Sequence, residues 1–263
     1  MDDWRSYDRV AATYERVHAP RLAEPARDLV EVAGIVEGDV VLDLGTGTGV
    51  AARAAAEAGG DVIGVDGSVG MLSVARSARA DVRVAAATAI DLPFRAGAFD
   101  VVIGGFVLAH FAKVETALFD VARVTRPGGR VAFSAWVDGQ DTFQQTWSEL
   151  LTSVVPKQVL ISATNEASPG LERFTSRAAV QETLYEAGFR KIRTETRRYR
   201  FTYRLDDYVE GLGVWAPGRF VHGMLGDAGW EALLARAQRT FADRFPDPIQ
   251  DFRDAVFAVG SKE

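Results

Sequence analysis

The chain has 263 residues, 48% of them hydrophobic, a net charge of −6 and no cysteine. This is enough apolar sequence for one large α/β domain with additions, and the negative charge argues against nucleic-acid binding. Without cysteine there are no disulfides, thiolate nucleophiles or cysteine-based zinc sites, and the three histidines lack metal-ligand spacing, so we expect no metal. No apolar run approaches the ~20 residues that span a bilayer, and the start lacks the apolar core of a secretory signal, so we expect a cytoplasmic chain without membrane attachment.

The first 35 residues are expected to form helices that cover the central domain. Apolar and aromatic side chains recur mostly three or four positions apart over residues 3–17, which indicates an amphipathic helix. A second helix is expected near residues 22–33. Pro20 and Pro25 are expected to interrupt the helical run, since proline lacks the backbone donor that a helix needs.

A strand, a glycine turn and a helix follow one another in residues 39–58. Gly45, Gly47 and Gly49 stand at alternate positions in the run Asp-Leu-Gly-Thr-Gly-Thr-Gly, which begins at Asp43. Glycine leaves no Cβ in the way, so a ligand can lie against the backbone and the first N–H groups of the helix. This predicts a nucleotide-type binding element, and the run resembles motif I of class I S-adenosylmethionine (SAM) methyltransferases.

The second expected strand, near residues 61–65, leads to Asp66, which stands 23 positions after Asp43. A carboxylate at this place commonly accepts from both hydroxyls of a ribose. The alternative is that Asp66 merely caps the helix expected over residues 68–79. With the glycine turn upstream, we favour ribose binding.

Residues 88–100 make the resemblance more specific. Leu92-Pro93-Phe94 and Phe99-Asp100 resemble the ubiquinone/menaquinone-biosynthesis-type branch of these enzymes (methyltransferase domain 11/25-like). Thr88 stands where that branch usually has an aspartate that accepts from the adenine amino group. A hydroxyl also accepts such a bond, but more weakly than a carboxylate does.

The order of the remaining elements predicts the fold class, a doubly wound α/β protein. Further strands are expected near 82–86, 99–104, 129–135, 189–201 and 253–260, with helices near 113–124, 142–155 and 174–188. The first five strands are continuous apolar runs, which is typical of a parallel sheet covered on both faces. Pro127-Gly128-Gly129 is expected to stop a helix and turn the chain. The result is a Rossmann-like, seven-stranded, mostly parallel sheet with one antiparallel strand and helical lid insertions.

Six segments are expected along the chain. They are N-terminal helices (1–35), the SAM-binding core (36–137), a helical insertion (138–175), a core helix with strand six (176–205), a helical lid (206–250) and the last strand (251–263). The aromatic residues of the two insertions favour an apolar pocket over a bulky, largely apolar acceptor. We expect a quinone- or polyketide-like small molecule, of the kind made in natural-product pathways.

The resemblance implies SAM as cofactor, S-adenosylhomocysteine (SAH) as its product, and methyl transfer to a small-molecule acceptor. The resemblance and the positions of the strand ends together predict the cofactor-binding residues. They are Tyr14, Asp43, Gly45, Thr46, Gly47, Gly49, Asp66, Gly67, Met71, Thr88, Ala89, Ile90, Gly105, Phe106 and His110. Histidine is the usual base near neutral pH, so His110 and His222 are candidate bases, with simple packing as the alternative for each. Asp138, after strand five, is a further crevice candidate.

Two other classes of function stay open from the sequence. An NAD-dependent oxidoreductase could share this fold, but the glycine spacing is not Gly-x-Gly-x-x-Gly and the Leu-Pro-Phe segment argues against it. A protein that keeps the SAM fold could instead bind SAM as a binding module or catalyse a reaction other than methyl transfer, since fold does not fix function.

Overall fold

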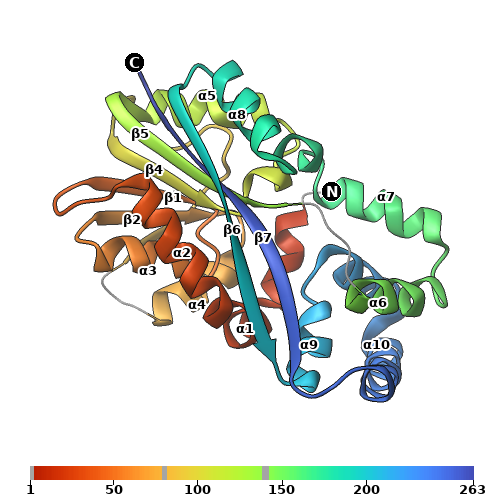
Figure 1. The fold of residues 1–263 in the computed structure, drawn as a ribbon. Helices are drawn as coiled ribbons and strands as arrows, with labels where there is room; N and C mark the ends of the chain where they lie inside the picture. Colours follow the sequence, from red (N-terminus) through yellow and green to blue (C-terminus); the bar gives the residue numbers. More distant parts are fainter. Residues whose placement is uncertain (1–2, 79–81, 138–141) are drawn as a thin grey trace.

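The computed structural model describes residues 3–78, 82–137 and 142–263, and a seven-stranded sheet forms its centre (Figure 1). The strand order is β3-β2-β1-β4-β5-β7-β6. All neighbours are parallel except that β7 runs antiparallel to both β5 and β6, which confirms the predicted fold class. The strands are β1 (Val40–Leu44), β2 (Asp61–Asp66), β3 (Arg83–Ala86), β4 (Phe99–Gly105), β5 (Thr125–Trp136), β6 (Arg190–Tyr203) and β7 (Ile249–Ser261).

Helices cover both faces of this sheet, and each face has its own apolar core. Side chains of α2 and α3 pack on one face, and side chains of α5 and α8 pack on the other. Alternating strands and helices therefore bury the continuous apolar strands on both sides, as the sequence pattern requires. The covering helices are α2 (Ala19–Ala33), α3 (Val50–Glu57), α4 (Val69–Ala78), α5 (Val114–Val124) and α8 (Arg177–Glu186).

The N-terminal segment is one nearly continuous helical run, and neither proline interrupts it. It passes through η1 (Asp3–Arg9), α1 (Ala11–Thr13) and the π-helical η2 (Tyr14–His18) directly into α2. The expected break was wrong because Pro20 lies in the first turn of α2, where a missing N–H costs nothing. Pro25 lies inside α2 as a buried residue, so packing there outweighs the lost hydrogen bond.

Two further boundaries differ from the sequence-based expectation. Strand β5 begins at Thr125, so α5 ends before Pro127 and the glycines after it lie within the strand, not in a turn. The cause is a shift of register between Phe99 and Val101 of β4, which lets β5 resume pairing after an irregular stretch. Residues 157–167 form a second helix within the expected helical insertion, where only one helix, near residues 142–155, was expected.

The two insertions lie together on one side of the molecule (Figure 1). They consist of α6 (Thr142–Thr152), α7 (Lys157–Ala167), α9 (Leu205–Leu212) and α10 (Ala216–Arg244), and α10 packs on the other three. Helix α10 is broken at Gly226, whose φ of 67° and ψ of 176° are not helical. Aromatic side chains of α6, α9 and α10 join the core beneath α2, so the insertions are continuous with the sheet domain.

Candidate functional site

The glycine turn after β1 places an open backbone at the carboxyl edge of the sheet. Gly45, Gly47 and Gly49 all have positive φ angles, of 68°, 55° and 86°. A Cβ at Gly45 would lie 2.2 Å from Cγ2 of Val107, so this glycine is required by packing. A Cβ at Gly47 would meet nothing within 4 Å, so this position leaves room beside the backbone.

Asp66, at the end of β2, is fixed to that turn by hydrogen bonds. Its Oδ2 accepts from the backbone N–H of Gly47 at 2.9 Å, and its Oδ1 accepts from the N–H of Ser68 at 2.8 Å. The first turn of α4 is capped instead by Ser68, whose Oγ accepts from the N–H of Met71 at 3.1 Å. A carboxylate offers about four acceptor positions, so two are left for a diol. Partial burial raises the pKa of Asp66, and the two N–H groups oppose that shift.

Three buried polar atoms beside the turn have no hydrogen-bond partner among the described residues. They are Oδ1 of Asp43, Oγ1 of Thr48 and Oγ of Ser134. The other oxygen of Asp43 accepts from Oγ1 of Thr46 at 2.6 Å. Burial raises the pKa of Asp43 to about 6. Unpartnered polar atoms are uncommon inside proteins, and their convergence here indicates a ligand site.

All three residues border a cavity of about 60 Å³ at the strand ends. Its wall includes the predicted residues Tyr14, Asp43, Gly45, Thr46, Gly47, Gly105 and Phe106, and also Leu22, Pro25, Ala26, Leu29, Thr48, Val50, Ala51 and Ser134. Half of the added residues come from one face of α2, where their spacing of three or four is a helical signal that the sequence already contained. Ser134 lies next to the end of the strand predicted near residues 129–135, so the rule that strand ends line the crevice could have found it.

The remaining cofactor candidates, Asp66 among them, do not line this cavity. Gly49 starts α3, and Gly67 lies in the turn between Asp66 and Ser68. Met71 is buried in α4. The N–H of Ala87 donates to the carbonyl of Asp66, which brings the following residues beside the ribose candidate. There Oγ1 of Thr88 donates to the carbonyl of Ile90 at 2.7 Å, Ala89 is buried, and Asp138 lies outside the described residues.

The N-terminal segment contributes Tyr14 to the cavity wall and contacts both the sheet domain and the insertions. On the core side, Oδ1 of Asp8 accepts from Oγ of Ser68 at 2.6 Å and from the N–H of Gly70 at 2.8 Å. On the insertion side, Arg16 forms ion pairs with Asp207, at 2.7 Å, and with Glu210. Ligand pockets usually exceed roughly 300 Å³, so we expect this cavity to widen when a cofactor binds.

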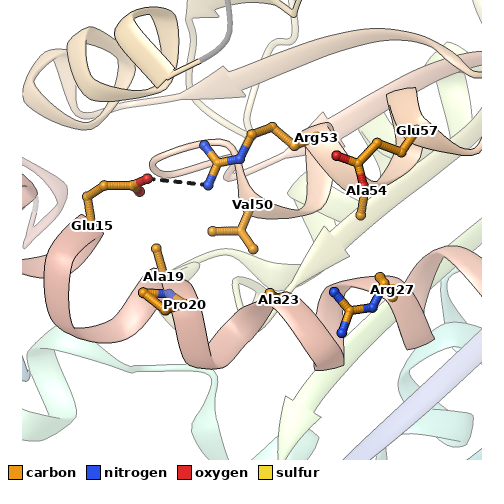
Figure 2. A pocket seen from close by; sticks show the side chains of 9 residues that line it. All are labelled: Glu15, Ala19, Pro20, Ala23, Arg27, Val50, Arg53, Ala54 and Glu57. Carbon is orange, nitrogen blue, oxygen red and sulfur yellow. Dashed lines mark hydrogen bonds and ion pairs between the residues drawn. The ribbon is translucent and has the colours of Figure 1, made fainter.

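A second cavity, of about 250 Å³, lies between α2 and α3 (Figure 2). Arg53 reaches across it, with Nη2 3.4 Å from Oε1 of Glu15 and Nη1 donating to the carbonyl of Thr48 at 2.7 Å. Val50 borders both cavities. Arg53 therefore joins the N-terminal segment to the glycine turn.

The two candidate bases lie in different surroundings. Nδ1 of His110 is 3.0 Å from the carbonyl of Ala167, and its ring meets that of Tyr7 edge-on at 6.2 Å. Its backbone N–H donates to the carbonyl of Val107, whose side chain lies beside Gly45, so His110 lies near the strand ends. His222 instead contacts Asp227 at 2.9 Å and stacks on Trp230, both within α10. The structure thus brings His110, and not His222, to the predicted cofactor residues that it describes.

No group of three or more metal-ligating side chains occurs in the described parts of the chain, nor does any described helix have the length and hydropathy of a membrane span.

Comparison with known proteins agrees with this geometry. A family model described as a methyltransferase domain matches residues 42–133. A demethylmenaquinone methyltransferase of Renibacterium salmoninarum is 34% identical over 54% of this chain and 60% of its own length. One of Beutenbergia cavernae is 32% identical over 63% of this chain and 72% of its own length. The matched part therefore spans between about three fifths and three quarters of these relatives.

A solved structure shares the fold. Phosphoethanolamine N-methyltransferase 2 of Haemonchus contortus, in complex with SAM, aligns with a TM-score of 0.60 over 97% of this chain and 57% of its own, at 19% identity. Fold, glycine turn and matches together define a class I SAM-dependent methyltransferase. Within that class, the chain belongs to the menaquinone/ubiquinone-type methyltransferase family, and SAM is its cofactor.

Proposed function

We propose that this protein transfers the methyl group of SAM to a small, largely apolar, quinone-like molecule. The observation that carries the proposal is the pairing of Asp66 with the N–H of Gly47, which joins the diol acceptor to the open glycine turn. The relatives' names, both demethylmenaquinone methyltransferase, support a quinone-like acceptor. The net charge of −6 supports a small molecule over nucleic acid, and the expected cytoplasmic location stays part of the proposal.

The residues present fit SAM. Asp66 has two acceptor positions left for the ribose hydroxyls, and Gly47 leaves the backbone open beside them. Asp43 offers an unpartnered buried oxygen, which suits a cationic amino group. Tyr14 reaches the same cavity from the N-terminal segment. We assign Thr88, Ala89 and Ile90 to the adenine side, because Ala87 joins them to Asp66.

The chemistry asks the protein for alignment, exclusion of water and the handling of one proton. SAM, when bound, supplies an electrophilic methyl group on a sulfonium. The N-terminal segment covers the crevice, and closure of this kind keeps water out and fixes the reacting groups in line. His110 is the proposed base. Its Nδ1 donates to the carbonyl of Ala167, so in the neutral ring Nε2 carries the lone pair that takes a proton from the acceptor.

We assign the acceptor side of the site to the apolar wall that α2 forms next to the helical insertions. Their aromatic side chains continue the core beneath α2, and α2 itself lines the cavity with Leu22, Ala26 and Leu29. Such an apolar wall favours a ring-containing acceptor over a charged one.

The test is methyl transfer by the purified chain from SAM to 1,4-dihydroxynaphthalene, followed by SAH release and by the mass of the product. We expect an added mass of one methylene unit and a matching amount of SAH. SAM binding without SAH release, over a panel of quinols and phenols, would favour a binding protein with the methyltransferase fold.

A further inference from the structure

The carboxyl end of β5 carries a hydroxyl that the cofactor residues leave unused. Oγ of Ser134 is buried, borders the cavity and has no partner among the described residues. Gly105 stands opposite it on β4, where a Cβ would lie 3.9 Å from that Oγ and 3.7 Å from Cδ2 of Leu29. The missing side chain at Gly105 therefore keeps the hydroxyl open to the cavity. A buried hydroxyl without a partner calls for an explanation, and a ligand group provides one.

Phe106 lies beside this hydroxyl in an unusual conformation. Its φ is 57°, in the left-handed region that bulky residues rarely adopt and that often marks ligand clamps. Its backbone N–H donates to the carbonyl of Ser134 at 3.0 Å, and its ring stacks on Trp136 with centroids 4.0 Å apart and planes 14° apart. Phe106 also borders the cavity, so an aromatic stack and a free hydroxyl share one wall.

Position in the sheet separates this wall from the ribose end. Asp66 ends β2, and β1, β4 and β5 follow in order across the sheet. Neighbouring strands are about 4.8 Å apart, so the end of β5 is roughly 14 Å from the end of β2. Ser134, Phe106 and Leu29 are also uncharged, which suits a neutral ring better than the charged amino-acid tail of SAM.

We propose that Ser134 and Phe106 form the ring subsite of the methyl acceptor. A planar aromatic ring stacks beside Phe106, backed by Trp136, and an oxygen substituent on that ring hydrogen-bonds to Oγ of Ser134. The inference rests on the proposed function and makes it more specific, since it names an oxygenated aromatic ring as the group recognised. Aromatic stacking sets the affinity for the ring, and the hydroxyl selects the oxygen.

The experiment measures binding of two probes to the SAH-saturated full chain by calorimetry. The first probe is 1,4-naphthoquinone, and the second is naphthalene, which has the same rings without oxygen. The variants are Ser134→Ala and Phe106→Leu. Their matched controls are Ser77→Ala, whose hydroxyl bonds within α4, and Phe119→Leu, which is exposed on α5.

Ser134→Ala should lower the affinity for naphthoquinone about tenfold and leave the affinity for naphthalene unchanged. Phe106→Leu should lower the affinity for both probes by about three- to tenfold. The controls should change the affinity for neither probe, and Ser134→Ala, Ser77→Ala and Phe119→Leu should bind SAH within about twofold of the natural chain. Because Phe106 is also one of the predicted cofactor residues, Phe106→Leu is compared at saturating SAH, where its effect on the two probes is separate from any change in SAH affinity.

Three results would overturn the ring subsite. The natural chain binds neither probe, or Ser134→Ala and Phe106→Leu leave the affinity for naphthoquinone unchanged. In the third, Ser134→Ala lowers the affinity for SAH and not the affinity for the probe, which would assign the hydroxyl to the cofactor site. Failure of the proposed function has a different signature, because it appears as absent SAH binding or absent methyl transfer in the natural chain.

Discussion

The backbone N–H of Gly47 donates a 2.9 Å hydrogen bond to Oδ2 of Asp66, so the turn after β1 holds the carboxylate that ends β2. Two neighbouring strands are thereby joined at the edge where a ligand lies. Because the bond uses one lone pair of one oxygen, it orients Asp66 without consuming its capacity to accept from a diol.

Asp66→Ala should weaken SAM binding by about 100-fold or more, since two charge-assisted hydrogen bonds to the ribose are lost. Asp61→Ala is the matched control, because Asp61 begins the same strand and forms a surface ion pair with exposed Arg83. Calorimetry with SAM measures both. Equal affinities for the two variants would remove the ribose role from Asp66.

Alanine at three glycines with positive φ should separate conformational strain from ligand contact. Gly38→Ala should cost about 1 kcal/mol of unfolding free energy and leave SAM binding intact, since nothing lies near its Cβ. Gly47→Ala should cost about the same stability but also block the cofactor. Gly45→Ala should be the least stable, because its Cβ would collide with Val107. Urea unfolding and SAM titration give the two readings for each variant.

Asp43 should make stability fall as pH rises through the weakly acidic range. Burial raises its pKa to about 6, above the ~3.9 of an unfolded aspartate, so between these values the folded chain holds a proton that the unfolded chain releases. The loss amounts to about 3 kcal/mol once pH exceeds 6. Asp43→Asn should be free of this slope. Urea unfolding of both proteins at pH 4 to 7 gives the free energy of unfolding at each pH, and the difference between the two profiles is the contribution of Asp43. Parallel profiles would contradict this contribution.

The ion pairs of Arg16 should slow the entry of SAM. They hold the N-terminal segment against α9, and each partner is at least one-third exposed, so the pairs are worth only ~0.2–1 kcal/mol each. Arg16→Ala should therefore speed SAM association by about two- to fivefold and reduce its dependence on salt. Stopped-flow fluorescence measures the rate, with Arg83→Ala as an exposed ion-pair control. An unchanged rate would mean that the segment opens without breaking this contact.

The two histidines should differ sharply in turnover. His110→Gln should lower kcat by roughly 100-fold or more while leaving SAM affinity intact, because it removes the proposed base. His222→Gln should lower kcat far less, since His222 contacts Asp227 and Trp230 inside α10. Steady-state rates over pH 6 to 9 give the comparison. A similar loss in both variants would point to a structural role for His110 as well.

The sequence was sufficient for the features that depend on local pattern. The alternate glycines, the acidic end of the second strand and the continuous apolar strands are all short-range signals, and the fold class follows from their order. The other outcomes depend on tertiary contacts. Pro25 is accepted inside α2 because it is buried there, and β5 starts early because β4 allows a shift in pairing. His222 contacts Asp227 and Trp230, which follow the break at Gly226, and no local pattern predicted that break.

The candidate site divides in the same way. Residues on the glycine turn and at strand ends could be named from the sequence, because parallel strands bring their carboxyl ends together. Ser134, near the end of a predicted strand, could have been named by the same rule, but the missing hydrogen-bond partner that singles it out is visible only in the folded structure. Leu22 and Leu29 were missed because the path of α2 across the cavity is a property of packing.

The N-terminal segment bonds to Ser68 and Gly70 on one side and to Asp207 and Glu210 on the other. Tyr14 of the same segment lines the cavity, so one strip of chain connects the cofactor residues, the sheet domain and the insertions. If this strip is displaced when the donor binds, its contacts with α9 change at the same time, so we expect the affinity for the acceptor to depend on whether the donor site is occupied.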